Sequence, residues 1–164
     1  MEKLRYLFIH CSDTPQGVWF DGEDIRDWHT SPKPEGRGWS QVGYNKVFRL
    51  DGTVETLVKT DHDEWVESNE ITNGAFSYNN ISNHWCLIGG MGSKQNNNFH
   101  QAGFTDYQWM ALNEQIKEFI AIHPEIKILG HNQVSEKNCP GFWVPNYLTN
   151  IGVPEKNIIN AKLI

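Results

Sequence analysis

Three side chains in this sequence have the chemistry of metal ligands. His131 and Cys139 lie eight positions apart within the segment Gly130–Phe142, and His10 lies near the start of the chain. Imidazole and thiolate together suit zinc, and catalytic zinc keeps three protein ligands with a fourth position open for water. Bound zinc lowers the pKa of that water to about 7. The residue types therefore predict a site of His10, His131 and Cys139 that holds one Zn2+ and can hydrolyse an amide.

Two further residues have the right chemistry to assist such a site. Attack on an amide carbonyl creates an oxyanion, which positive charge or hydrogen-bond donors stabilise. Lys137 lies two residues before Cys139, and Tyr44 follows a glycine that allows close approach of the backbone. Spacing alone does not fix the role of either residue.

Two other chemical interpretations of the same residues remain open. Cys139 can be a thiol nucleophile with His131 or His10 as its base. The chain lacks the local signatures of common thiol proteases, and no helix begins at Cys139 to lower its pKa. Alternatively, the seven Trp residues line a carbohydrate- or peptide-binding groove, and the His–Cys group is a structural zinc site or has no role. An activity assay with and without a chelator separates the three.

Two short strands are needed to position the two histidines. Residues 4–9 are apolar and predict a buried strand that ends at His10, and the apolar run 126–129 precedes His131 in the same way. When two strand ends lie side by side in one sheet, they face the same crevice. We therefore expect His10 and His131 to lie close together.

Other segments give clear local signals. Residues 23–30 predict a short helix that Asp21 or Gly22 caps, with His29 in a packing role. Two alternating runs joined by Asp51-Gly52 predict a hairpin with a type I′ turn.

The second half of the chain also contains segments whose secondary structure can be predicted. A capping box of Thr105 and Gln108 begins a helix that runs to about Ile122, and residues 142–151 predict a last short helix. Residues 84–89 read as a strand, 59–83 as a solvated acidic loop, and 95–98 as a loop without chemical signature.

Composition narrows the class of protein. The chain has 164 residues, a net charge of −6 and no basic run, so nucleic acid is not expected as a partner. No apolar run is long enough to span a membrane, and the N-terminus lacks the apolar region of a signal peptide. We expect synthesis in the cytoplasm. Three cysteines do not suggest a disulfide framework, and Cys11 and Cys86 are expected to be buried small hydrophobes.

Several motifs in this order resemble the zinc-dependent N-acetylmuramoyl-L-alanine amidases of the phage amidase-lysozyme type, whose fold animal peptidoglycan recognition proteins share. The resemblance runs from about Tyr6 to Leu148, and together its motifs are highly specific. They are Phe8-Ile9-His10-Cys11-Ser12, Ile25-Arg26 with Trp28-His29, Val42-Gly43-Tyr44-Asn45, Asp51-Gly52-Thr53-Val54-Glu55, Cys86-Leu87-Ile88-Gly89-Gly90, Phe104-Thr105, and Gly130-His131 through Lys137-Asn138-Cys139-Pro140-Gly141-Phe142.

The resemblance implies a fold and a reaction. The fold class would be α/β, a single domain over residues 1–164 with a central mixed β-sheet flanked by helices. The reaction would be zinc-dependent hydrolysis of the amide between N-acetylmuramic acid and L-alanine in peptidoglycan, with zinc-bound water as nucleophile. A catalytically inactive peptidoglycan-binding module of the same fold is the alternative. The short length and the missing signal peptide favour a phage or prophage endolysin over a bacterial cell-wall recycling enzyme. We expect a monomer that acts on the cell wall after release, without membrane insertion.

The resemblance also assigns residues. His10, His131 and Cys139 match the zinc ligands, and Tyr44 and Lys137 match the residues that assist catalysis. The residues expected to contact substrate are Arg37, Trp39 and Asn79.

Three features depart from the family pattern. Phage-type relatives often carry a histidine near the position of Gly74, and an aspartate where Trp143 stands here. Residues 60–80 also look longer than usual. These differences bear on how the substrate is handled.

Overall fold

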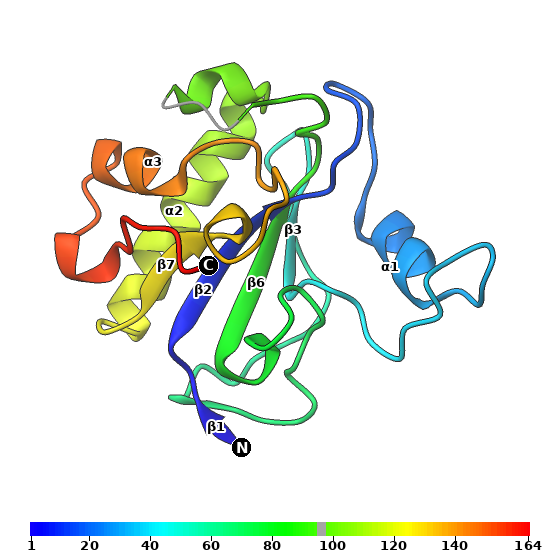
Figure 1. Ribbon diagram of the computed structural model, residues 1–164, viewed down its shortest axis with the longest axis horizontal. Helices are drawn as coiled ribbons and strands as arrows, with labels where there is room; N and C mark the ends of the chain where they lie inside the picture. The colour runs from blue at the N-terminus through cyan, green and yellow to red at the C-terminus, as the bar shows by residue number, and fades with distance from the viewer. Residues whose placement is uncertain (95–97) are drawn as a thin grey trace.

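A five-stranded sheet forms the centre of the computed structural model, which describes residues 1–94 and 98–164 (Figure 1). Its strand order is β4-β3-β6-β2-β7. The pairs β2–β6, β2–β7 and β3–β6 are parallel, and β3–β4 is antiparallel, so the predicted mixed sheet is confirmed. The strands are β2 (Tyr6–Cys11), β3 (Lys46–Phe48), β4 (Val54–Thr56), β6 (Ser82–Leu87) and β7 (Lys127–Gly130).

Helices cover both faces of this sheet, as the resemblance implies (Figure 1). The predicted helices are present as α1 (Gly22–Thr30), α2 (Asp106–Ile122) and α3 (Val144–Asn150). Short 3-10 turns are η1 (Asn79–Ile81), η2 (Phe99–Ala102), η3 (His131–Gln133) and η4 (Glu155–Asn157). Among the described residues, no helix is both long and apolar enough to cross a membrane.

The main core lies between the sheet and α2. The α2 side chains of Leu112, Ile116 and Phe119 pack with Leu7 and Ile9 of β2 in one buried cluster. Each fully buried aliphatic side chain contributes about 1.5–3 kcal/mol through removal from water. This packing makes β2 rigid, and β2 is the strand that carries His10.

The opposite face of the sheet is covered in part by α1. Ile25 of α1 packs with Val47, Cys86 and Ile88 in a second buried cluster. Asp21 is the N-cap, as expected, because its side chain accepts the backbone N–H groups of the first turn. This face of the sheet holds the candidate site.

The β3–β4 hairpin has a different turn from the one predicted. Gly52 has φ 83, whereas Asp51 is not among the residues with positive φ, so the type I′ prediction is wrong. Arg49 N–H donates to Thr53 O and Gly52 N–H donates to Arg49 O, each at 2.9 Å. Because the Asp51 carboxylate accepts Thr53 N–H at 2.9 Å, it favours a longer turn in which only glycine needs positive φ.

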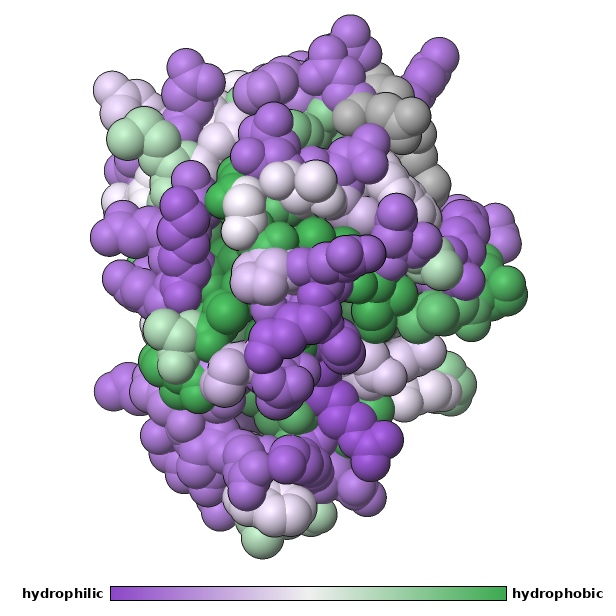
Figure 2. All heavy atoms as spheres, turned by 90° about the vertical axis from the view of Figure 1, so that its left-hand side faces the viewer, coloured by the Kyte–Doolittle hydropathy of each residue, from purple (hydrophilic) through white to green (hydrophobic). Residues whose placement is uncertain are grey.

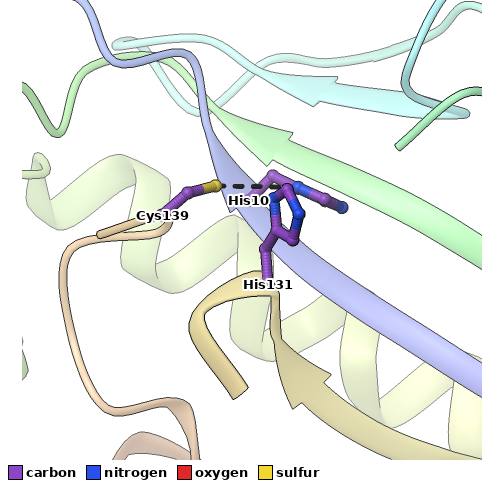
Figure 3. Close-up of side chains that lie close together, drawn as sticks. All are labelled: His10, His131 and Cys139. Carbon is purple, nitrogen blue, oxygen red and sulfur yellow. Dashed lines mark hydrogen bonds between the residues drawn. The ribbon is translucent and has the colours of Figure 1, made fainter. Parts of the chain in front are cut away.

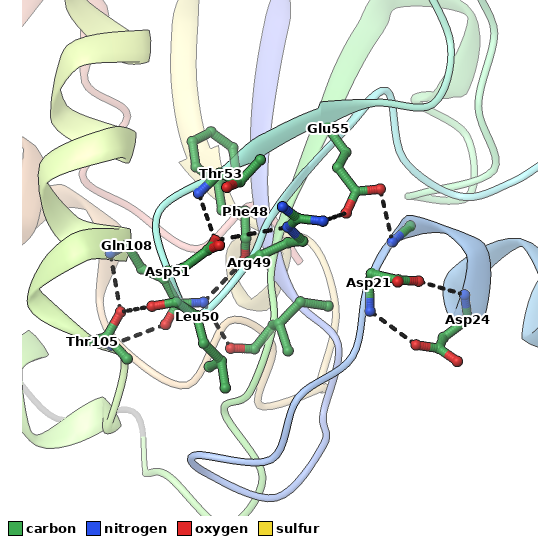
Figure 4. Close-up of polar contacts among 12 residues, drawn as sticks. Asp21, Asp24, Phe48, Arg49, Leu50, Asp51, Thr53, Glu55, Thr105 and Gln108 are labelled. Carbon is green, nitrogen blue, oxygen red and sulfur yellow. Dashed lines mark hydrogen bonds and ion pairs between the residues drawn. The ribbon is translucent and has the colours of Figure 1, made fainter.

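The hairpin also connects the two larger helices to the sheet (Figure 4). At the start of α2, Thr105 Oγ1 donates to Leu50 O at 2.7 Å, and Gln108 Nε2 donates to Phe48 O at 3.0 Å. At the start of α1, Gly22 N–H donates to Glu55 Oε2 at 3.1 Å. Residues of one hairpin therefore fix the N-terminal ends of both α1 and α2.

The segment expected to be a solvated acidic loop is more ordered than predicted. Glu70 is buried, and its carboxylate accepts the backbone N–H groups of Asp61 and Glu67. A short strand β5 (Trp65–Val66) pairs with β1 (Glu2–Lys3), which the sequence patterns did not predict. Of the expected loop 95–98, residues 95–97 lie outside the described part of the chain.

The face that carries α2 and α3 has a mixed surface. Figure 2 shows hydrophilic residues over most of this side, with apolar residues exposed in patches between them. Met110 and Ile122 on α2 are among the exposed large apolar side chains. The candidate chemistry lies elsewhere, at the carboxyl ends of the parallel strands.

Candidate metal centre and groove

His10, His131 and Cys139 come together although they are far apart in the sequence (Figure 3). His10 is the last residue but one of β2, and His131 directly follows β7. The pairing of Ile9 with Gly130 places the two strand ends side by side, as expected from the sequence. His10 Nδ1 lies 3.6 Å from Cys139 Sγ, and one donor atom from each of the three residues lies within 4.8 Å of the others.

The loop that carries Cys139 is held against β2 and η3 by main-chain contacts. Cys11 N–H donates to Cys139 Sγ at 3.2 Å, and Asn132 N–H donates to Cys139 O at 2.7 Å. The buried Asn132 amide also donates to Phe142 O at 3.0 Å. The sulfur is therefore positioned before any cation binds.

Burial keeps the two histidines neutral. Burial, followed by the charges of His84 and His131, holds the pKa of His10 well below its usual range. Burial and then the Lys137 charge lower the pKa of His131 to about 4. Neutral imidazole is the form that binds a metal ion, so both rings are in the binding form at neutral pH.

The Cys139 thiol, unlike the two imidazoles, must lose a proton before it can bind a metal ion. Burial raises its pKa well above the usual range, so without a nearby cation it stays protonated. A protonated thiol is a weak nucleophile, which disfavours the thiol-nucleophile interpretation. A bound cation would stabilise the thiolate, because coordination deprotonates a thiol.

A groove of about 1030 Å³ runs over the three residues. His131 and Cys139 line it directly, and His10 lies beneath them with 1% of its surface exposed. All the other candidate residues from the sequence lie on its walls: Tyr44, Lys137, Arg37, Trp39 and Asn79.

Tyr44 and Lys137 both line the groove that runs over the three donor residues. The ring centroids of Tyr44 and His10 are 5.1 Å apart. Burial raises the pKa of the Tyr44 hydroxyl well above its usual range, so it remains a hydrogen-bond donor. Lys137 is exposed at the groove wall, and its charge acts on His131.

The three expected substrate contacts lie on two parts of the wall. The Arg37 guanidinium lies 5.0 Å from the centroid of the Trp39 ring, in a cation–π arrangement. Trp39 also packs on His29, whose Nδ1 accepts Gly43 N–H at 2.9 Å in the expected packing role. Asn79 Oδ1 accepts Ala75 N–H at 2.8 Å, which orders the neighbouring loop.

Sequence patterns did not identify His84, which lies within this site. His84 is fully buried in β6, and its Nδ1 lies 3.0 Å from His10 Nε2. It also occupies the space next to Gly74, the position near which phage-type relatives often carry a histidine: a Cβ at residue 74 would lie 2.4 Å from His84 Cγ. The sequence did show a histidine within the predicted strand 84–89. Its proximity to His10 could not be predicted, because it depends on the register in which β2 pairs with β6.

Comparison with known proteins gives consistent matches. A family model described as N-acetylmuramoyl-L-alanine amidase matches residues 1–142. The endolysin of Enterobacteria phage K11 is 35% identical over 147 residues, which are 87% of each chain. Among solved structures, the Ph2119 endolysin from the Thermus scotoductus MAT2119 bacteriophage aligns with a TM-score of 0.66 and 23% identity, over 97% of this chain and 88% of that one. Drosophila PGRP-LB aligns with a TM-score of 0.67 and 22% identity, over 100% and 88%. At these identities the two structures show a shared fold.

Proposed function

The chain belongs to the N-acetylmuramoyl-L-alanine amidase family, and we propose that it hydrolyses peptidoglycan with one zinc ion held by His10, His131 and Cys139. The bond cleaved is the amide between N-acetylmuramic acid and L-alanine. The observation that carries the proposal is the convergence of the three donor side chains at the floor of the groove.

The donor set fits zinc on chemical grounds. Two imidazoles and one thiolate are ligands that zinc prefers, and three protein ligands leave one position open. The remaining polar atoms around the site also fit, because His10 Nε2 faces His84 and the Cys139 sulfur accepts Cys11 N–H. Such contacts orient metal ligands in proteins. Zinc bound there would lower the pKa of water and polarise a carbonyl group.

Tyr44 and Lys137 supply the electrostatic part of the reaction. We assign both to the oxyanion that forms when an amide carbonyl is attacked. Tyr44 donates a hydrogen bond from a hydroxyl that burial keeps protonated. Lys137, which also lines the groove, supplies a positive charge.

Arg37, Trp39 and Asn79 are assigned to substrate binding. The guanidinium of Arg37 is planar and presents several donors, which suits a carboxylate of the stem peptide. Trp39 offers an aromatic face to which a sugar or peptide can pack. Asn79 comes from a separate segment that lines the same groove, where its amide offers a further polar contact to the substrate.

The whole of residues 1–164 is assigned to a single amidase domain that acts as a monomer. Synthesis in the cytoplasm followed by action on the cell wall after release is supported by the similarity to phage endolysins. Sedimentation of the purified chain tests the monomer; a stable dimer would contradict it.

The test is hydrolysis of purified cell walls by the parent protein, by chelator-treated protein and by the treated protein after zinc is restored. We expect new amino termini from the parent, loss with chelator and recovery with zinc. A thiol nucleophile would instead keep its activity in the presence of chelator and lose it after alkylation of the cysteine. A binding module would bind cell walls without releasing amino termini.

Ala substitution of Arg37, Trp39 or Asn79 tests the substrate-binding assignment. Each variant should have a raised KM and an unchanged zinc content, and an unchanged KM would remove that residue from the binding surface.

A further inference from the structure

His84 is a buried polar side chain on the same face of the sheet as His10. It pairs with Phe8 across β2 and β6, and the two rings stack with centroids 5.3 Å apart and planes at 23°. His84 Nδ1 lies 3.0 Å from His10 Nε2, and both side chains are withdrawn from solvent. His84 therefore contacts the side of the His10 ring that faces away from Cys139.

We propose that His84 is a positioning residue of the metal centre, which holds the His10 ring in the tautomer that leaves Nδ1 free to bind the metal. This inference rests on the proposed zinc site. His84 does not contact substrate or metal; it acts through His10.

The geometry assigns a separate role to each nitrogen of His10. Nδ1 faces the Cys139 sulfur at 3.6 Å, and Nε2 faces His84. A neutral imidazole carries one proton, so a lone pair on Nδ1 requires the proton on Nε2. That proton can be donated to His84 Nδ1, which is the usual way in which an outer contact fixes a ligand histidine.

The other nitrogen of His84 supports a functional rather than a purely structural role. When His84 Nδ1 accepts a hydrogen bond, its own proton lies on Nε2. Among the described residues, His84 Nε2 is buried and has no hydrogen-bond partner. An unpaired buried polar atom is unfavourable, and an apolar side chain would avoid it at a position required for packing alone.

The surroundings of His84 leave its ring little freedom. A Cβ at Gly74 would lie 2.4 Å from both Cγ and Nδ1 of His84 and 2.8 Å from Gly43 O. Gly74 is therefore the residue that makes room for this ring. His84 is also anchored through its main chain, because Asn45 Oδ1 accepts His84 N–H at 2.8 Å.

The test measures zinc affinity by competition with a chromophoric chelator. His84→Leu fills the buried position with an apolar side chain and removes the acceptor, and we expect zinc affinity to fall by about 10–100-fold. His84→Asn restores an acceptor near the position of Nδ1 and should stay close to the parent. Ser82→Ala is the matched control, since Ser82 is equally buried in β6 but bonds to Tyr78 O, and its zinc affinity should not change. Equal affinity in His84→Leu and the parent, or equally weak binding by His84→Leu and His84→Asn, would overturn the proposal.

A second measurement uses the unaltered chain and does not depend on a variant that folds. Long-range 1H–15N NMR spectra of imidazole report which nitrogen carries the proton. We expect the His10 proton on Nε2 both without and with zinc, and a proton on Nδ1 would refute the inference. A parent chain that binds no zinc would instead refute the proposed function. The two failures are therefore distinguishable.

Discussion

The backbone N–H of Cys11 donates a hydrogen bond to Cys139 Sγ at 3.2 Å, although the two residues lie 128 positions apart. The donor is main chain, so the contact does not depend on the Cys11 side chain. Cys11 directly follows His10 in β2. The end of one strand therefore carries one candidate ligand and orients a second, which explains how a distant loop can contribute to the site.

Lys137→Ala tests the proposed oxyanion charge. Loss of one stabilising donor lowers kcat by about a hundredfold to a thousandfold in comparable sites. Zinc content should stay at the parent level, because Lys137 is not in the donor set. Steady-state hydrolysis of cell-wall fragments measures the effect, with Lys117→Ala on the exposed side of α2 as control. A rate for Lys137→Ala equal to the control would remove the residue from the mechanism.

Tyr44→Phe tests the second proposed donor. The change removes one hydroxyl, and we expect kcat to fall by about a hundredfold while zinc is retained. Tyr44 also packs against the buried cluster that contains Cys86, so a buried tyrosine outside the site is needed as a control for structural effects. Tyr147→Phe is a matched control, since its buried hydroxyl bonds to Trp109 O within the core. If both variants lose the same stability and keep the same rate, Tyr44 has only a structural role.

His29 gives the protein a pH-dependent contribution to stability. Burial, and then the charge of Arg37, lower the pKa of His29 to about 4. The unfolded chain has the usual value of about 6.5, so it binds more protons between these limits. The contribution of His29 is fully present above about pH 6.5 and is lost as the pH falls through about 4.

Urea unfolding of the metal-free protein at about pH 7 and about pH 4 measures this effect. His29→Asn keeps an acceptor for Gly43 N–H but does not titrate, so its free energy of unfolding should fall less than that of the parent. Comparison of the two chains removes the contribution of other groups that titrate in this range. Parallel pH profiles would show that His29 is not the source.

Gln133 connects the segment after β7 to the end of the chain. Its Oε1 accepts Gly130 N–H at 2.8 Å, and its Nε2 donates to Ile159 O and Ala161 O. Gln133 is fully buried, so Gln133→Ala leaves these groups without a partner and should lower the free energy of unfolding by about 1–3 kcal/mol. Chemical denaturation measures the loss.

Hydrogen exchange locates the same effect. Leu163 N–H donates to Gln133 O at 2.7 Å, and we expect faster exchange at Leu163 in Gln133→Ala than in the parent. Unchanged protection at Leu163 would mean that the end of the chain is held by other contacts.

The sequence allowed much of the site to be predicted because strand ends are visible as apolar runs. His10 and His131 each follow such a run, and parallel pairing of β2 with β7 brings them together. The candidate groove residues line one groove, and their roles stay proposals. His84 was missed because a buried strand does not reveal its register: only the pairing of Phe8 with His84 places that ring beside His10.

Other differences have similar physical causes. The type I′ prediction for the hairpin failed because the Asp51 side chain stabilises a longer turn. Glu70 was expected in a solvated loop, but a carboxylate that accepts two backbone N–H groups can be buried. Both differences come from hydrogen bonds between a side-chain carboxylate and backbone N–H groups. Hydrophobic periodicity, from which strands and helices are predicted, does not reveal such bonds.

Zinc content measured by elemental analysis in the parent, Cys139→Ser and Cys11→Ala tests the central claim most directly. The account predicts about one zinc per chain in the parent and in Cys11→Ala, because the latter keeps the backbone donor to the Cys139 sulfur. It predicts loss of both zinc and cell-wall hydrolysis in Cys139→Ser. Zinc and full activity retained in Cys139→Ser would contradict it.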